Sequence, residues 1–276
     1  MAEFVGRFTI DRHGEWLDTG IGIDKNDVYT FIGLGEIDIE KTGTNPYKYP
    51  NVGVDGDPRH TLNSHPINWH LRHGCLMGKL NDENNFVKIG TGLDYQHPHT
   101  KNEPYTLAVA SNVVAEHATG AFEVLVLKKA NYAESVTVAN FRVKAPTASS
   151  KWQDPTSGAV TVKKGQKLLF ASALPHEPEN QPMVHGEFKV DTKGKLDGNP
   201  STSGDGEFVK ADQDFLAPGL RQYALVGRIG TGKPFEVGNK NEVVAPDEGP
   251  LQLALNDDEL KTNTGYVDVV VVVAKA

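Results

Sequence analysis

The chain has 276 residues, with 28 lysines plus arginines against 36 aspartates plus glutamates, so its formal net charge is −8 at neutral pH. This acidic balance argues against a nucleic-acid partner or a general affinity for anionic membranes. The single cysteine, Cys75, excludes a disulfide within the chain and is expected to be a small buried apolar side chain. The longest apolar run, 269–274, is too short for membrane insertion, and no secretory signal is readable. We expect a protein that is cytoplasmic as synthesised, or released without a conventional signal peptide.

Short runs of alternating apolar and polar residues, separated by clusters of Gly, Pro, Asn and Asp, continue along the whole chain. A period of two predicts half-buried strands, and no segment keeps a helical period for more than about two turns. In chain order, the clearest strands are predicted at 8–11, 28–32, 107–109, 122–126, 141–144, 160–162, 168–170 and 267–273. The pattern predicts an all-β chain built from β-sandwiches.

The sequence contains two copies of one pattern, opened by Trp16 and again by Trp152. The clearest shared blocks are Leu-Met-Gly-Lys-Leu at 76–80 with Leu-Val-Gly-Arg-Ile at 225–229, and Gly-Ala-Phe-Glu-Val at 120–124 with Gly-Tyr-Val-Asp-Val at 265–269. Such a repeat predicts two tandem domains, residues 1–133 and residues 134–276. Equivalent positions in the two copies favour a structural role for Trp16 and Trp152.

An acidic turn beginning at Asn256 and Asp257 lies between two strand-like runs near the end of the second copy. Its carboxylates, amides and hydroxyls are the oxygen ligands that a hard cation such as Ca²⁺ prefers. The twelve-residue spacing of an EF-hand is absent. On composition alone, a turn of this kind is more typical of a solvated hairpin.

This turn, with Asn263-Thr264-Gly265 after it and the blocks at 225–238 and 245–251 before it, resembles the PA-I galactophilic lectin family. The resemblance implies two tandem β-sandwich domains of jelly-roll, galactose-binding-like type. In that family, a small β-sandwich domain binds one calcium ion through its Asn-Asp loop, and galactose hydroxyls complete the coordination of the ion.

The resemblance assigns the calcium ligands of the second copy residue by residue. The family's calcium aspartate corresponds to Asp257, and its two ligand asparagines correspond to Thr262 and Asn263. Thr262 departs from the family pattern, and Asp258 can supply a compensating carboxylate. In the first copy, Val113 stands where the aspartate belongs, so calcium is expected in the second copy.

The resemblance also implies sugar-contacting residues. The family segment Gly-x-x-Gly-Asp-x-x-His-x-x-Gln places His60 and Asn63 of the first copy on the His and Gln positions. The second copy keeps a glutamine, Gln213, but no histidine. With the ligands Asp257 and Thr262, these residues form the predicted carbohydrate-binding set, and the two copies depart from the pattern in opposite halves of the site.

Two other chemistries compete with this interpretation. The first copy is rich in histidine, including residues 60, 65, 70, 73, 97 and 99, but it lacks cysteine or carboxylate at zinc-site spacing, so surface histidines are expected. The run from Gly227 to Lys233 matches a phosphate-binding loop except at its last position, where Pro234 replaces Ser or Thr. We therefore expect a strand and a hairpin turn there. Trp69 and Tyr95 are the aromatic residues best suited to ligand contact.

No nucleophile, base and acid arrangement can be singled out in the chain, so an enzyme is not expected. The sequence predicts a carbohydrate-binding or adhesion protein that recognises sugar hydroxyls with the help of calcium, galactose-containing glycans above all. A homo-oligomer would make such binding multivalent. The alternative is a structural or protein-interaction component built on degenerate lectin-like domains.

Overall fold

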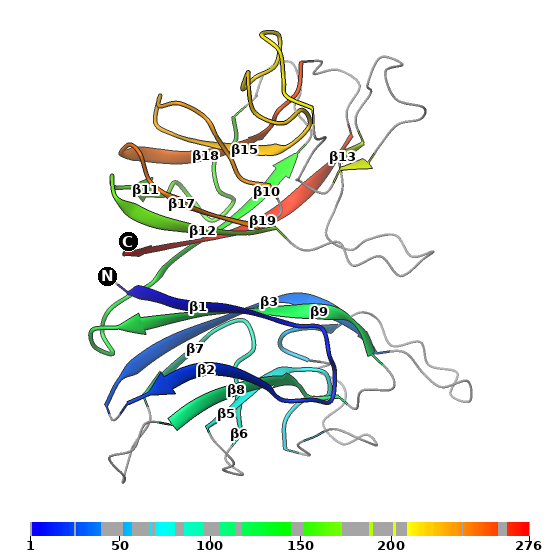
Figure 1. Cartoon of the computed structure of the whole chain (residues 1–276), viewed down its shortest axis with the longest axis vertical. Coiled ribbons are helices and arrows are strands. Elements are labelled where there is room, and N and C mark those ends of the chain that lie inside the picture. Colours follow the sequence, from blue (N-terminus) through cyan, green and yellow to red (C-terminus); the bar gives the residue numbers. More distant parts are fainter. Residues whose placement is uncertain are drawn as a thin grey trace, which may run out of the picture. The chain divides into compact units, whose positions relative to one another are not determined.

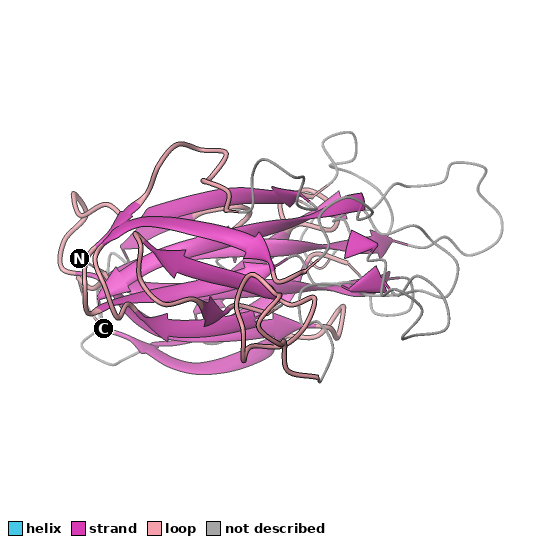
Figure 2. Cartoon of the chain, turned by 90° about the horizontal axis from the view of Figure 1, so that it is seen from above, coloured by secondary structure: helices cyan, strands magenta, loops and turns pink. Residues whose placement is uncertain are grey.

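The computed structural model of the chain describes strands β1 to β19 and the turns between them (Figure 1). The described residues are 2–24, 26–39, 52–56, 67, 70–80, 86–96, 105–113, 118–144, 152–172, 188–189, 201–202, 209–238, 240–258 and 264–275. They contain no helix, so the predicted all-β fold is confirmed (Figure 2). Accordingly, none of them belongs to a helix long and apolar enough to cross a bilayer.

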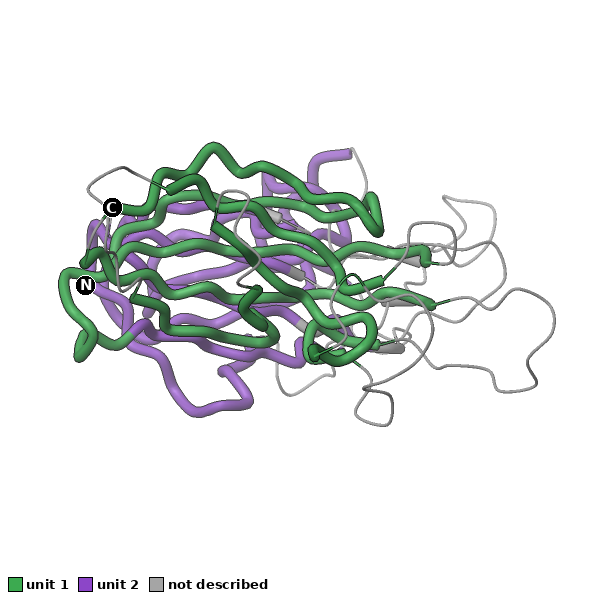
Figure 3. The backbone as a smooth tube through the Cα atoms, turned by 90° about the horizontal axis from the view of Figure 1, so that it is seen from below, with its two compact units in different colours: residues 1–135, 176–180 green, residues 136–175, 181–276 purple. Residues whose placement is uncertain are grey.

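The chain divides into two compact units, drawn in different colours in Figure 3. Unit 1 comprises Met1–Ser135 and His176–Asn180, and unit 2 comprises Val136–Pro175 and Gln181–Ala276. The main division therefore lies between residues 135 and 136, two residues after the boundary expected from the sequence repeat.

The described strands of unit 1 form two antiparallel sheets that face each other (Figure 1). Its strands are β1 (Glu3–Ile10), β2 (Leu17–Ile23), β3 (Val28–Ile39), β4 (Val52–Gly53), β5 (Leu76–Leu80), β6 (Phe86–Lys88), β7 (Leu93–Gln96), β8 (Tyr105–Ser111) and β9 (Ala118–Lys129). One sheet has the order β1-β9-β3-β4, with β7 also paired to β3, and the other has the order β2-β8-β5-β6. Side chains from both sheets, such as Phe31, Phe122 and Leu76, form the core.

Unit 2 has the same arrangement of two facing sheets (Figure 1). Its strands are β10 (Thr137–Lys144), β11 (Thr161–Val162), β12 (Gln166–Ser172), β13 (Phe188–Lys189), β14 (Ser201–Thr202), β15 (Leu225–Ile229), β16 (Phe235–Glu236), β17 (Lys240–Val244), β18 (Gly249–Leu255) and β19 (Thr264–Lys275). In one sheet, β19 lies between β10 and β12, and β17 pairs with the other edge of β12. The short β13–β14 pair also joins this sheet, through pairing of β13 with β19. The other sheet has the order β11-β18-β15-β16. Alternate valines of β19 enter the core, as a period of two requires.

Strand register recurs at positions that the sequence repeat aligns. Gly78 of β5 lies opposite Val109 of β8, and Gly227 of β15 lies opposite Leu253 of β18. The units differ in what pairs with the other edge of β8 and of β18. In unit 1 both ends of β2 pair with β8, with a register shift between Asp18 and Gly22. In unit 2, among the described residues, the edge of β18 away from β15 pairs with Gln153 and with the two residues of β11.

Strand β10 pairs only with β19 among the described strands, and side chains protect its other edge. The Gln153 amide accepts a hydrogen bond from the Lys144 N–H (2.9 Å) and donates one to the Lys144 carbonyl (2.7 Å). The N–H and hydroxyl of Thr156 both donate to the Asn140 carbonyl, each at 2.8 Å. Uncapped edge groups can pair with another chain, so these bonds guard the sheet against such pairing.

Cys75 lies just before β5 and is fully buried, as expected for a structural cysteine. Burial raises the pKa of its thiol to about 11. The thiolate, which is the reactive form, is therefore scarce at neutral pH.

Candidate functional site

Asn256, the residue after β18, is fully buried and connects the end of this strand to the segment 209–224, called here the 209–224 loop. Its side-chain carbonyl accepts a hydrogen bond from the Ala217 N–H (2.8 Å). Its amide group donates to the carbonyls of Ala217 (3.1 Å) and Arg221 (2.8 Å). The acidic turn therefore begins with a buried asparagine whose side chain holds the 209–224 loop by hydrogen bonds, called here a clamp. Its first residue is not part of a solvated hairpin.

Asp257 follows this clamp and is only 1% exposed. Its main-chain carbonyl accepts a hydrogen bond from the Leu216 N–H at 3.3 Å. Gln213 lies three residues before Leu216 and is exposed, and Asp258 is half-buried. The structure therefore places the loop that carries Gln213 against the turn that carries Asp257 and Asp258. The other two predicted ligands, Thr262 and Asn263, lie outside the described residues.

The 209–224 loop is well packed although its only strand pairing is one isolated bridge, Lys210 to Arg221. Phe215 and Tyr223 are buried in the core of unit 2 and meet edge to face, with ring centroids 5.7 Å apart. The Ala211 N–H donates to the Leu220 carbonyl at 2.7 Å. A loop held in this way loses little conformational freedom when it binds a ligand.

Tyr223 adopts a positive φ of 57°, which is uncommon for a residue with a bulky side chain. The corresponding residue of unit 1 is Gly74, with a φ of 76°. The two residues make equivalent main-chain hydrogen bonds: the Tyr223 N–H donates to the Asn256 carbonyl, and the Gly74 N–H donates to the Asn112 carbonyl. Aligning the two copies would have revealed this backbone conformation, since the glycine marks the position.

Unit 1 has an equivalent asparagine clamp but lacks the aspartate that follows it in unit 2. Asn112 is fully buried, and its side-chain amide donates to the carbonyls of Leu71 (3.2 Å) and Arg72 (3.0 Å). The next residue is Val113, which is also buried. The scaffold of the turn thus recurs in unit 1, but an apolar side chain occupies the position of Asp257.

The start of the segment that leads to His60 is described, whereas His60 and Asn63 lie outside the described residues. Asp55 forms an ion pair with Lys88 at 2.8 Å. The hydrogen bond from Lys88 is the largest influence on the pKa of Asp55 and lowers it, against the effect of burial. This carboxylate is therefore engaged with Lys88 at the end of β6.

Among the described residues, no group of three or more His, Cys, Asp or Glu side chains is arranged to hold a metal ion. His70 and His73 are described and form no such group, while His60, His65, His97 and His99 lie outside the described residues. At the acidic turn, Asp257 and Asp258 carry carboxylates. Carboxylate oxygens are ligands that a hard cation such as calcium prefers.

The two repeat tryptophans occupy similar surroundings. The Lys79 ammonium lies 4.7 Å from the ring centre of Trp16, and the Arg228 guanidinium lies 4.6 Å from that of Trp152. Trp16 also stacks on Phe86, with centroids 5.5 Å apart and planes inclined by 14°. Such packing agrees with the structural role inferred from their equivalent positions.

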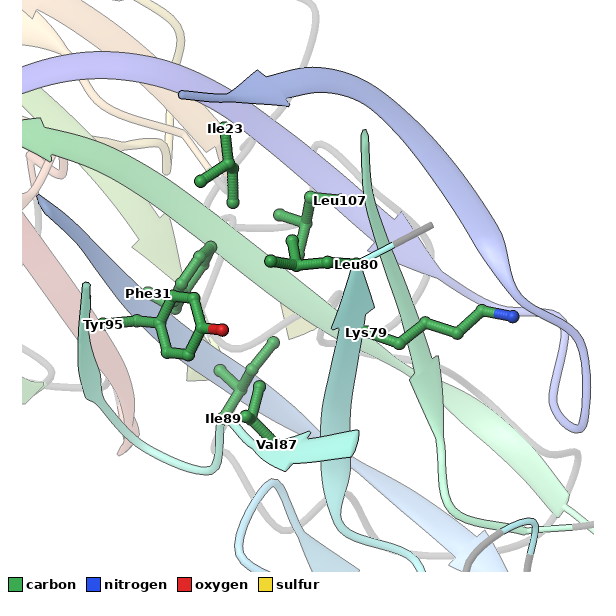
Figure 4. A pocket seen from close by; sticks show the side chains of 8 residues that line it. All are labelled: Ile23, Phe31, Lys79, Leu80, Val87, Ile89, Tyr95 and Leu107. Atoms are coloured by element: carbon green, nitrogen blue, oxygen red, sulfur yellow. The ribbon is translucent and has the colours of Figure 1, made fainter. Parts of the chain in front are cut away.

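Tyr95 borders an apolar hollow between the sheets of unit 1 (Figure 4). The hollow contains about 280 Å³ of open space, solvent included, and is lined by Ile23, Phe31, Lys79, Leu80, Val87, Ile89, Tyr95 and Leu107. Lys79 points away from the other labelled side chains. The lining offers few hydrogen-bonding groups, so the hollow does not suit a sugar.

The glycine-rich run from Gly227 to Lys233 forms the end of β15 and the turn into β16. A phosphate-binding loop leads into a helix, whereas this segment leads into an antiparallel strand. The predicted strand and hairpin turn is confirmed.

A structural comparison finds similarity to a protein described as "EclA N-terminal domain; PllA-like lectin". The two share 15% sequence identity with a TM-score of 0.34, and the match covers 46% of this chain and 98% of the other. No protein-family model matches the chain, and no curated protein matches it. The case for a function therefore depends on the residues of the chain itself.

Proposed function

We propose that the chain is a carbohydrate-binding protein without catalytic activity, and that unit 2 binds sugar hydroxyls at a calcium site centred on Asp257. The observation that carries this proposal is the buried turn at Asn256 and Asp257, held by hydrogen bonds against the loop that carries Gln213. The galactophilic specificity comes from the sequence resemblance, which assigns the same turn to the ion.

Calcium would be held by Asp257, with Asp258, Thr262 and Asn263 supplying further oxygens. When bound, it would provide a positive centre that takes sugar hydroxyls as ligands. Asn256 positions Asp257 by fixing the chain immediately before it. The clamp therefore prepares the turn before any ligand arrives, which lowers the entropic cost of binding.

The neighbouring loop supplies groups that can choose between sugars. Asp212, Gln213 and Asp214 are all exposed there. The amide of Gln213 can donate to one hydroxyl and accept from another, and the carboxylates can accept from hydroxyls. Because hydroxyl orientation distinguishes galactosides from other hexosides, polar groups at fixed places can give stereochemical preference.

The two units are proposed to be a duplicated domain whose ligand sites have diverged. Val113 supplies no oxygen ligand from its side chain, so unit 1 is expected to leave the ion site unused. His60 and Asn63 would give unit 1 at most a calcium-independent sugar contact. We therefore expect one calcium ion for each chain.

Thermal unfolding with calcium or with chelator tests the ion site. At free calcium one hundred times its dissociation constant, binding stabilises the folded chain by about 2.7 kcal/mol, which raises the melting temperature. Asp257→Asn keeps the shape of the side chain but removes its charge, and it should abolish this rise. Asp55→Asn removes a carboxylate from unit 1 and serves as the control that keeps the rise.

A glycan array with and without chelator tests the sugar. Galactose-terminated glycans should bind only in the presence of calcium, and Asp257→Asn should lose the signal while Asp55→Asn retains it. A chain with neither a calcium-dependent rise in melting temperature nor a glycan signal would instead support a structural or protein-interaction role.

A further inference from the structure

Trp152 belongs to a small apolar cluster separate from the main core of unit 2. The cluster contains the buried residues Ala217, Val226 and Ala254, against which Trp152, Leu216 and Leu220 pack. Val226 and Ala254 come from β15 and β18, whereas Leu216, Ala217 and Leu220 belong to the 209–224 loop. The cluster therefore attaches this loop to the sheet.

The same loop residues touch the Asp257 turn through their main chain. The Leu216 N–H donates to the Asp257 carbonyl at 3.3 Å, and the Ala217 N–H donates to the Asn256 side chain at 2.8 Å. Leu216 and Ala217 thus have side chains in the Trp152 cluster, and their main-chain N–H groups are hydrogen-bonded to the turn at Asn256 and Asp257. Any shift of their side chains would displace the partners of Asn256 and Asp257.

A polar chain holds the Trp152 ring in place. The Arg228 guanidinium lies 4.6 Å from the ring centre, and its Nε and Nη2 atoms donate to Gln252 Oε1 at 3.0 and 2.7 Å. Gln252 in turn donates to Asp154 Oδ1 at 3.0 Å. Main-chain bonds between Gln153 and Leu253, at 2.8 and 3.0 Å, fix the residue next to Trp152 on β18.

We infer that Trp152 is a positioning residue for the Asp257 site: through Leu216 and Ala217, it determines where the Gln213-bearing loop lies against the ion turn. This inference rests on the proposed function for its ligand. The link from the tryptophan to the loop is a property of the folded chain and can be measured without any ion.

Trp16 provides a matched control within the same chain. It occupies the equivalent repeat position and contacts a cation from the equivalent strand, Lys79 of β5. In unit 1 the acidic position is Val113. Replacing either tryptophan by phenylalanine removes the same atoms, but only Trp152→Phe alters the packing of the 209–224 loop.

The first measurement is hydrogen exchange in the full chain without calcium. In Trp152→Phe, the amides of Leu216 and Ala217 should exchange about tenfold faster, while the amide of Leu253 in β18 keeps its protection. Trp16→Phe should leave all three amides unchanged. Equal protection of Leu216 and Ala217 in the parent chain and in Trp152→Phe would overturn the inference, as would equal loosening in Trp16→Phe.

The second measurement is the dissociation constant for calcium chloride by calorimetry. Supporting residues around metal ligands typically contribute a factor of 10–100 in affinity, so Trp152→Phe should weaken binding by about tenfold or more and Trp16→Phe should not. Faster amide exchange with unchanged calcium affinity would refute the positioning role. A parent chain that binds no calcium would refute the proposed function, while the exchange data would still decide whether Trp152 holds the loop.

Arg228→Lys is a milder variant in case Trp152→Phe does not fold. Lysine cannot reproduce the two hydrogen bonds from guanidinium to Gln252, and unit 1 already uses Lys79 at this position. Its effects on the Leu216 and Ala217 amides and on calcium affinity should have the same direction and a smaller size. Unchanged values in both measurements would contradict the inference.

Discussion

Asn256 and Asn112 each satisfy the main-chain groups of a loop from a fully buried position. Asn256 makes one bond as acceptor and two as donor, and Asn112 donates to two carbonyls. Buried groups that lose such partners carry the full cost of their removal from water. The residue type is therefore required for structure at both positions, irrespective of any ligand.

Asn256→Ala should lower the free energy of unfolding by about 2–3 kcal/mol, because the Ala217 N–H and two carbonyls lose their partners. Asn112→Ala should have a comparable effect, since its side-chain amide donates to the carbonyls of Leu71 and Arg72. Urea unfolding of both variants beside the parent chain measures the difference. A loss below about 0.5 kcal/mol in Asn256→Ala would show that water replaces the clamp.

At the scale of elements, one ionic network joins three strands of unit 1. Lys129 at the end of β9 is almost fully buried, with its side chain 3% exposed, and pairs at 2.9 Å with Asp94 of β7. Asp94 also accepts a hydrogen bond from Thr30 of β3. Lys129 donates to the Tyr132 carbonyl at 3.2 Å, and the Tyr132 hydroxyl donates to the Asp94 carbonyl at 3.2 Å. The network ties the chain after β9 to the sheet.

The pKa of Asp94 makes this network dependent on pH. Burial is the largest influence and raises the pKa, but the hydrogen bonds from Thr30 and Lys129 and the charge of Lys129 outweigh it, so the pKa lies below its usual value. A carboxyl with a lowered pKa stabilises the fold above its unfolded pKa of about 3.9, and this stabilisation is lost as the pH falls through the folded pKa.

Asp94→Asn should therefore lower the free energy of unfolding at neutral pH, with the difference from the parent chain shrinking below about pH 4. We expect about 1–2 kcal/mol at pH 7, less than for a fully buried pair, because the Asp94 side chain is 40% exposed. Asp27→Asn, which breaks a pair with the more exposed Lys128 (39% against 3% for Lys129), is the control and should cost less. Denaturant unfolding between pH 3 and about pH 7 measures both. A difference that stays constant with pH would contradict the assignment.

At the scale of the whole molecule, the alternating pattern and the turn residues were sufficient to predict the all-β fold. Alternation was enough for strands such as β3 and β19 because one face of each enters a core. The burial of Asn256 and Asp257 could not be predicted, because their partners Leu216, Ala217 and Arg221 are distant in the sequence and belong to a loop without period. For the same reason, the apolar cluster that Trp152 shares with this loop leaves no local signal in the sequence.

The two units share a scaffold and differ in the chemistry placed on it. Both clamp the turn after the equivalent strand, β8 or β18, with an asparagine, and both place a cation over the repeat tryptophan. The next residue is Val113 in unit 1 and Asp257 in unit 2, and both are buried. Conservation of the scaffold explains why one sequence pattern occurs twice, while the change at this position predicts a single ion site in the chain.

A crystal structure of the chain grown with calcium and galactose would decide whether the Asp257 turn binds sugar through an ion. We predict one calcium ion on the Asp257 carboxylate, with galactose hydroxyls bound to it beside Gln213, and no ion at Val113. Anomalous scattering from calcium identifies the ion independently of the sugar. Galactose bound without calcium, calcium bound away from Asp257, or neither bound at all would contradict it.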